Sequence, residues 1–296
     1  MDLIIDTDPG QDIDDLLALW FALKRPELNV RAITTVTYPT EPRARIAKRL
    51  LRLLGRTDVA VGAGMQLPMR PFSDAEMAFQ KDLAKSMNHA CFADPPDDPR
   101  DAPDTPDVPA LIAATAGRCP DGATIACLGP YTNIAATLLR YPDIKPRIKQ
   151  IFVMGGEFDL PRTEHNVDWD SAAADILLRS GIPLAFGPWS VTRQFTLPMA
   201  DCAVFGASPA PAAKEIFAAI NIWHPAQSWK PGPVMYDIFP ILHALAPGKY
   251  YEMETRKIAI IPPGMTQSDS DGVEVSAARA IDAEAARRIF FETVLG

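Results

Sequence analysis

Short apolar runs alternate with amphipathic stretches along most of the chain. Runs rich in Ile, Val and Ala are typical of buried strands, and the stretches between them repeat apolar residues with helical spacing. This alternation predicts an α/β fold with a mostly parallel central sheet flanked by helices. The predicted strands are Leu3–Ile5, Val30–Val36, Val59–Val61, Thr124–Leu128, Ile151–Met154 and Pro183–Phe186, and the predicted helices are Asp14–Lys24, Arg43–Leu54, Asn133–Leu139 and Ser171–Ser180.

The pattern changes in two regions and again near the end of the chain. Residues 64–109 are rich in Pro and Asp, which indicates a long loop that carries one helix. Residues 207–233 indicate a helix followed by an aromatic loop with Trp223, His224 and Trp229. No internal repeat or interdomain linker is visible, so we predict a single domain over residues 1–296. The remaining predicted elements are helices Ala75–Ser86, Ala212–Ile222, Asp237–Leu245 and Asp282–Leu295, and a hairpin of Tyr250–Ile261 and Val273–Ile281 around a solvated turn at Met265–Gly272.

Composition and charge narrow the class of protein. Asp and Glu number 37 against 29 Lys and Arg, for a net charge of −8, whereas nucleic-acid binding uses an excess of basic residues. The longest apolar run, Leu16–Leu23, is shorter than the ~18 residues of a membrane span, and the N-terminal residues do not resemble a signal peptide. Four cysteines without C-x-x-C spacing fit a reduced compartment. We therefore expect a cytoplasmic protein that binds neither nucleic acid nor membrane.

Five aspartates crowd into the ten residues that follow the first predicted strand: Asp6, Asp8, Asp12, Asp14 and Asp15. Ligands of α/β folds bind outside the carboxyl ends of the strands, where this segment lies. Capping of the next helix accounts for some of these carboxylates, but so many close together would repel one another without a cation. Because no Cys or His lies nearby, the oxygen donors favour Ca²⁺ or Mg²⁺, and the spacing is not that of an EF-hand.

Four further segments accompany this cluster in a fixed order. Ala32–Val36, Leu128–Ala135, Val153–Gly156 and Glu164–Asn166 read AITTV, LGPYTNIA, VMGG and EHN. Together with DTDPG at residues 6–10, these blocks make the chain resemble the inosine–uridine nucleoside hydrolase family over roughly residues 1–240. The resemblance implies a nucleoside hydrolase-like fold, a bound Ca²⁺ and hydrolysis of ribonucleosides by a homodimer or homotetramer.

The resemblance also implies roles for single residues. Asp8 would act as a general base that takes a proton from water. Other carboxylates and a backbone carbonyl would hold the ion, and a second set of side chains would hold the ribose. The implied metal ligands are Asp8, Asp15, Asp237 and the backbone carbonyl of Leu128, and the implied ribose-binding residues are Asp14, Met154, Glu164 and Asn166.

The chain departs from the family pattern around the leaving base. Tyr236 stands where many members have a His, and a Tyr with a pKa near 10 is a poorer acid at neutral pH. His89 in the long loop is a second candidate for the catalytic acid, and Trp223 and His224 are candidates to contact the base. Asp12 belongs to an insertion in the aspartate motif and is a candidate to replace or supplement a metal ligand.

The sequence therefore predicts Ca²⁺-dependent hydrolysis of the N-glycosidic bond of a ribonucleoside, which releases ribose and a free purine, pyrimidine or modified base. Two alternatives stay open. One is a catalytically altered or non-enzymatic family member that binds ribosyl groups, because the residue expected to protonate the base is changed. The other, less favoured, is a phosphohydrolase that uses the aspartate cluster, although Gly10 replaces the Thr or Val usual in that class.

Overall fold

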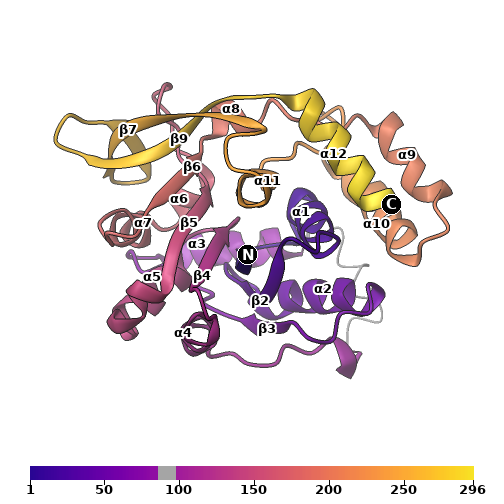
Figure 1. The fold of residues 1–296 in the computed structure, drawn as a ribbon, viewed down its shortest axis with the longest axis horizontal. Coiled ribbons are helices and arrows are strands. Elements are labelled where there is room, and N and C mark those ends of the chain that lie inside the picture. Colours follow the sequence, from indigo (N-terminus) through magenta and orange to yellow (C-terminus); the bar gives the residue numbers. More distant parts are fainter. Residues whose placement is uncertain (86–97) are drawn as a thin grey trace.

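A nine-stranded sheet, counted over the described residues 1–85 and 98–296, forms the centre of the computed structural model (Figure 1). Its strand order is β3-β2-β1-β4-β5-β6-β9-β7-β8. Neighbouring strands pair in parallel from β3 to β9, and β7 pairs antiparallel with both β9 and β8. This confirms the mostly parallel α/β sheet predicted from the sequence. The strands are β1 (Asp2–Thr7), β2 (Asn29–Thr35), β3 (Ala60–Ala63), β4 (Ala123–Cys127), β5 (Ile148–Met154), β6 (Leu184–Gly187), β7 (Tyr251–Ile261), β8 (Met265–Ser268) and β9 (Val273–Ile281).

Helices cover both faces of the sheet, because alternate residues of each buried strand point to opposite sides. Leu3 and Ile5 of β1 join the apolar cluster shared with α1, α2 and α9–α12, whereas Ile4 joins the cluster shared with α4, α5 and α7. The helices are α1 (Asp14–Leu23), α2 (Thr40–Leu53), α3 (Asp74–Ala84), α4 (Val108–Arg118), α5 (Thr132–Arg140), α6 (His165–Trp169), α7 (Ser171–Leu178), α8 (Trp189–Thr192), α9 (Met199–Ala207), α10 (Pro211–Ala226), α11 (Ile238–Leu245) and α12 (Ala283–Leu295).

Most predicted elements are confirmed to within a few residues, but the sequence pattern missed α4, α9 and the short helices α6 and α8, and it misassigned two segments. α10 continues to Ala226, so Trp223 and His224 lie on a helix rather than in a loop. Burial of Trp223 in the core stabilises the last turn of α10 despite Pro225. Met265–Ser268 forms β8 instead of a solvated turn, because it pairs with the edge of β7.

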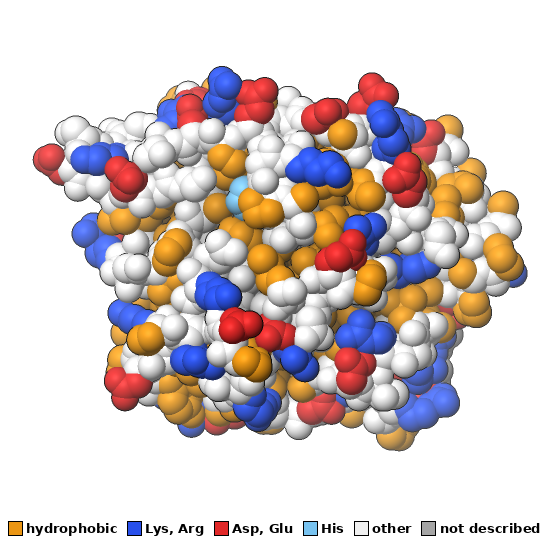
Figure 2. All heavy atoms as spheres, viewed as in Figure 1, with side chains coloured by type: hydrophobic (Ala, Val, Ile, Leu, Met, Phe, Trp, Pro, Cys, Tyr) orange, Lys and Arg blue, Asp and Glu red, His pale blue; other side chains and the backbone are white. Residues whose placement is uncertain are grey.

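The described surface mixes charges of both signs (Figure 2). On the face drawn in Figure 2, Lys and Arg side chains are interspersed with Asp and Glu, so the described residues form no continuous basic surface there. No helix in the described ranges combines the length and apolarity that crossing a bilayer requires. Cys119, Cys127 and Cys202 are buried free thiols, which fits their expected role as small packing residues; Cys91 lies outside the described residues.

Asp6, near the end of β1, is completely buried and links β1 to its neighbours by hydrogen bonds. Its Oδ1 accepts hydrogen bonds from Thr34 Oγ1 on β2 at 2.5 Å and from Asn133 Nδ2 on α5 at 2.8 Å. Asn133 in turn accepts a bond from the backbone N–H of Met65, after β3, at 2.9 Å. Burial raises the pKa of Asp6 to about 7. This aspartate therefore holds β1, β2 and α5 in register immediately below the cluster that follows it.

Arg43, in the first turn of α2, is also completely buried. Its guanidinium donates to the backbone carbonyls of Thr37 and Pro9, each at 3.0 Å, and to that of Asp8. The side chain thus joins the loop after β2 to the loop after β1. Burial lowers the pKa of Arg43, while the nearby charge of Asp8 opposes that change.

Replacing Arg43 with Met should destabilise the protein by about 3 kcal/mol, because buried carbonyl groups would lose their donors. Urea unfolding followed by circular dichroism measures the change. Arg45→Met on the same helix is the matched control, since Arg45 pairs with the exposed Glu41 and its loss should cost less than about 1 kcal/mol. Equal destabilisation of the two variants would contradict the joining role of Arg43.

His243 on α11 is buried, with its ring edge-on to Phe152 and stacked on Phe239. Burial lowers the pKa of His243 from 6.5 to about 4. Between those pH values the unfolded chain binds a proton that the folded protein does not, so acid should destabilise the folded state. His243→Phe should remove up to about 3 kcal/mol of the stability that wild type loses between pH 7 and pH 4. Urea unfolding at both pH values measures this difference, and parallel pH dependence of the two proteins would disprove it.

Candidate functional site

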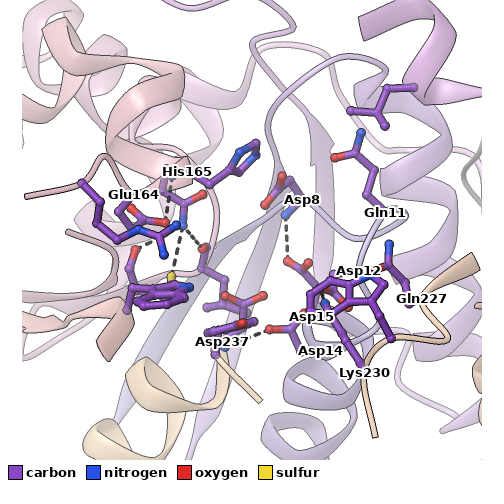
Figure 3. A pocket seen from close by; sticks show the side chains of 18 residues that line it. Asp8, Gln11, Asp12, Asp14, Asp15, Glu164, His165, Gln227, Lys230 and Asp237 are labelled. Carbon is purple, nitrogen blue, oxygen red and sulfur yellow. Dashed lines mark hydrogen bonds and ion pairs between the residues drawn. The ribbon is translucent and has the colours of Figure 1, made fainter. Parts of the chain in front are cut away.

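The loops after β1, β4 and β5 meet the segment before α11 at the carboxyl edge of the sheet, where they line a cavity of about 350 Å³ (Figure 3). α/β folds bind their ligands at this edge. The sequence candidates in this pocket come from distant parts of the chain, which the parallel strands bring together. The lining residues are Asp8, Gln11, Asp12, Asp14, Asp15, Leu83, Leu128, Met154, Arg162, Glu164, His165, Asn166, Trp189, Gln227, Trp229, Lys230, Tyr236 and Asp237.

Asp14, Asp15 and Asp237 each offer a carboxylate oxygen, and these oxygens lie within 4.8 Å of one another. Asp14 and Asp15 begin α1, and Asp237 immediately precedes α11, so the starts of two helices bring the three side chains together. Asp15 Oδ1 accepts bonds from Thr7 Oγ1 at 2.5 Å and from the backbone N–H of Asp8 at 3.0 Å. Asp14 Oδ2 accepts a bond from the backbone N–H of Asp237 at 3.2 Å. These bonds fix the orientation of Asp14 and Asp15 beside Asp237.

The three carboxylates are buried, and their electrostatics favour a cation among them. Burial, with the charges of neighbouring carboxylates, raises the pKa of Asp15 to about 7 and the pKa of Asp14 and Asp237 well above the ordinary range. A divalent cation would favour the charged form of all three. Because the donors are carboxylate oxygens, they fit a hard ion such as Ca²⁺ or Mg²⁺.

Asp8 and Asp12 line the same pocket outside this group of three. The Asp8 carboxylate lies so close to Gly129 that a Cβ atom at this glycine would come within 2.5 Å of Oδ1. Burial raises the pKa of Asp8, and the charge of Arg43 opposes that change. Asp12 forms an ion pair with Lys230, at 2.5 Å between Oδ2 and Nζ. The structure thus gives the inserted Asp12 a basic partner within the protein.

Glu164 and Asn166 lie at the start of α6 and line the pocket, where Glu164 is on another side of it from Lys230 (Figure 3). The Glu164 carboxylate accepts bonds from the backbone N–H groups of Asn166 and Gly156, both at 3.0 Å. Asn166 Nδ2 donates to the carbonyls of Leu128 at 2.7 Å and Met154 at 3.2 Å. Of the four residues that the sequence resemblance assigned to the ribose, the structure brings Met154, Glu164 and Asn166 together, and it places Asp14 with the carboxylate group.

Of the residues expected to contact the base, the structure places Tyr236 in the pocket but Trp223 and His224 outside it. Tyr236 lines the pocket, and burial raises its pKa to about 12, so its phenol stays protonated at neutral pH. Trp223 is completely buried in the apolar core and does not line the pocket. His224 lies outside the pocket as well, with Nε2 3.2 Å from the carbonyl oxygen of Lys230. His89 lies outside the described residues.

Several lining residues were not among the sequence candidates. Trp229 and Lys230 follow α10, and only the aromatic character of that segment pointed to them. Arg162 lies over the ring of Trp189, with its guanidinium carbon 3.7 Å from the ring centroid. His165 is exposed and lines the pocket beside Glu164. His165 lies within the EHN motif, whereas no local motif marks Lys230 or Arg162, which tertiary contacts bring to the cavity.

Comparison with known proteins gives one consistent family. The chain matches the family model for inosine-uridine preferring nucleoside hydrolases over residues 3–288. A pyrimidine-specific ribonucleoside hydrolase from Citrobacter koseri is 30% identical over 262 residues, which cover 85% of this chain and 81% of the relative.

Solved structures share the fold over its full extent. A purine-preferring ribonucleoside hydrolase from Gardnerella vaginalis superimposes with a TM-score of 0.85 and 25% identity, covering 100% of this chain and 98% of the other. A plant nucleoside hydrolase superimposes with a TM-score of 0.80 and 25% identity, covering 100% and 99%. With the aspartate-lined pocket at the carboxyl edge of the sheet, these matches show that the chain belongs to the inosine–uridine preferring nucleoside hydrolase family and is a hydrolase acting on N-glycosyl compounds.

Proposed function

We propose that this enzyme uses a bound Ca²⁺ to hydrolyse a ribonucleoside to ribose and a free base. The proposal rests mainly on the group formed by Asp14, Asp15 and Asp237, which lies in one pocket with Glu164 and Asn166. Buried carboxylates suit a hard divalent ion, and the neighbouring polar groups suit the hydroxyls of a sugar. The pocket therefore offers an ion site and a sugar site side by side.

The ion would be held by Asp14, Asp15 and Asp237, with Asp8 and the Leu128 carbonyl as further oxygen donors in the same pocket. When bound, Ca²⁺ supplies positive charge that orients hydroxyl groups and lowers the pKa of a nearby water. Hydrogen bonds from Thr7 and from backbone N–H groups orient the carboxylates of Asp14 and Asp15 before any ligand enters.

The chain's own residues divide the remaining work. Asp8 acts as the general base and takes the proton from the attacking water. Asp8 rather than Asp12 has this role because Asp12 is paired with Lys230. Glu164 and Asn166 hold ribose hydroxyls, and Met154 packs against the sugar. Because cleavage of an N-glycosidic bond builds positive charge on the sugar ring, the carboxylates around it stabilise the transition state.

The nucleobase is not defined by the relatives, whose names include both a pyrimidine-specific and a purine-preferring enzyme. We propose a purine or pyrimidine ribonucleoside, natural or modified, as the substrate class. Assembly as a homodimer or homotetramer stays a prediction from the sequence resemblance, and a cytoplasmic location stays a prediction from the composition and the cysteine pattern.

The enzyme should release ribose from at least one of inosine, adenosine, uridine and cytidine, and this activity should disappear after dialysis against EGTA. Added Ca²⁺ should restore it more fully than Mg²⁺, because Ca²⁺ accepts several carboxylate ligands whereas Mg²⁺ tends to keep several of its waters. A reducing-sugar assay measures the released ribose, with p-nitrophenyl riboside as an additional substrate. Full activity in the presence of EGTA would refute the role of the ion, and inactivity on every riboside would refute the proposed reaction.

Asp237→Asn should weaken Ca²⁺ binding by on the order of 10-fold or more, because the site loses one of its negative charges. Isothermal titration calorimetry on the dialysed protein measures this independently of catalysis. Asp121→Asn is the matched control, since Asp121 is exposed and lies before β4 rather than after it. Unchanged Ca²⁺ affinity in Asp237→Asn would remove this residue from the ion site.

Asp8→Asn should lower kcat by about 10²–10⁴-fold while leaving the fold intact, because an amide cannot take the proton from water. Steady-state kinetics at saturating Ca²⁺ measures the loss, and circular dichroism checks the fold. Retention of full activity would overturn the assignment of Asp8 as general base.

A further inference from the structure

Lys230 is a pocket residue to which the proposed reaction so far gives no role. It is 6% exposed, which is unusual for a lysine, and it lines the same cavity as the carboxylate group. Its Nζ lies 5.5 Å from the ring centroid of Trp223, 5.1 Å from that of Trp229 and 6.0 Å from that of Tyr236. An ammonium group surrounded by aromatic faces is attracted to them and shielded from water.

Both the backbone and the side chain of Lys230 are held in place. Its N–H donates to the carbonyl of Gln227 at 2.8 Å, and its own carbonyl lies 3.2 Å from His224 Nε2 at the end of α10. Its Nζ is paired with Asp12 Oδ2 at 2.5 Å. Asp12 therefore supplies the partner that fixes this ammonium group at the pocket wall.

The position of Lys230 relates it to the base rather than to the sugar. Glu164 lies on one side of the carboxylate group in Figure 3, and Lys230 lies on the other side with Gln227. Trp229 and Tyr236 also line the pocket and present aromatic rings near Nζ. Flat aromatic walls suit the faces of a nucleobase, so the Lys230 side of the pocket fits the leaving group when the ribose lies between Glu164 and the ion site.

We propose that Lys230 is the leaving-group residue, which donates a hydrogen bond from its ammonium group to an oxygen or nitrogen acceptor on the departing nucleobase. This inference rests on the proposed hydrolysis. As the C1′–N bond breaks, its electron pair moves to the base, and the fixed positive charge stabilises the negative charge that develops there. Lys230 keeps its proton throughout. Water adds its oxygen to C1′ and gives one proton to Asp8, and the released base takes a proton from solvent.

This role explains how the pocket works with Tyr in place of the expected His. Tyr236 lines the pocket in place of that His, and Lys230 Nζ lies 6.0 Å from the centroid of its ring. A lysine ammonium group has donors only, which restricts good substrates to bases that turn an acceptor atom toward it.

The test compares two leaving groups in wild type, Lys230→Met and Lys230→Arg, all as full chains loaded with Ca²⁺. One substrate is the nucleoside that wild type hydrolyses fastest, and the other is p-nitrophenyl riboside, whose nitrophenolate departs without stabilisation by the enzyme. Lys230→Met should lower kcat for the nucleoside by about 10²–10³-fold, and this loss should exceed the loss on p-nitrophenyl riboside by at least about 30-fold. Lys230→Arg should recover part of the nucleoside activity.

Two controls separate this role from a structural one. Lys214→Met removes an exposed lysine near the start of α10, the helix that precedes Lys230, and should leave both activities unchanged. Lys230→Gln keeps a polar group beside Asp12 and carries the comparison if circular dichroism shows that Lys230→Met is misfolded. Equal losses on the two substrates, or no loss on the nucleoside, would overturn the inference while the proposed function stands. Failure of wild type to cleave any riboside would overturn both.

Discussion

The buried aspartates at the carboxyl edge of the sheet repel one another, and the other groups of the site compensate this repulsion. Charges of one sign can be crowded away from water only where opposite charge or hydrogen-bond donors compensate them. Arg43 lies on one side of the group and Lys230 on another, and the space among Asp14, Asp15 and Asp237 suits a divalent cation. The same exclusion of water strengthens the electrostatic effect of these groups on a reacting sugar.

Neighbouring aspartates in one segment thus serve different purposes, because each meets a different environment. Asp6 lies inside the sheet and accepts bonds from Thr34 and Asn133, which makes it part of the framework. Asp15, at the start of α1, is oriented toward the pocket by Thr7. Asp12, in the loop between them, reaches the lysine that follows α10. Local sequence spacing alone does not distinguish these three situations.

The parallel sheet and the position of Glu164 and Asn166 in one pocket could be predicted from the sequence, because both depend on local patterns. Strand and helix periods are visible within a few residues, and Glu164 and Asn166 lie in one short motif. The part of the pocket around Lys230 could not be predicted in the same way. The pairing of Lys230 with Asp12 joins residues 218 positions apart in the chain. Trp223 was expected to contact the base, but α10 continues past it and its side chain is buried in the core.

The exposure of Trp229 has a consequence for observing this pocket. Trp229 is 76% exposed, whereas Trp20, Trp169 and Trp223 are at most 5% exposed and the faces of Trp189 are covered by the guanidinium groups of two arginines. The protein therefore carries one water-exposed indole at the mouth of its cavity among largely shielded ones. The intrinsic fluorescence of Trp229 should therefore report binding in the cavity. A planar molecule that enters the cavity would change the surroundings of this indole far more than those of the others.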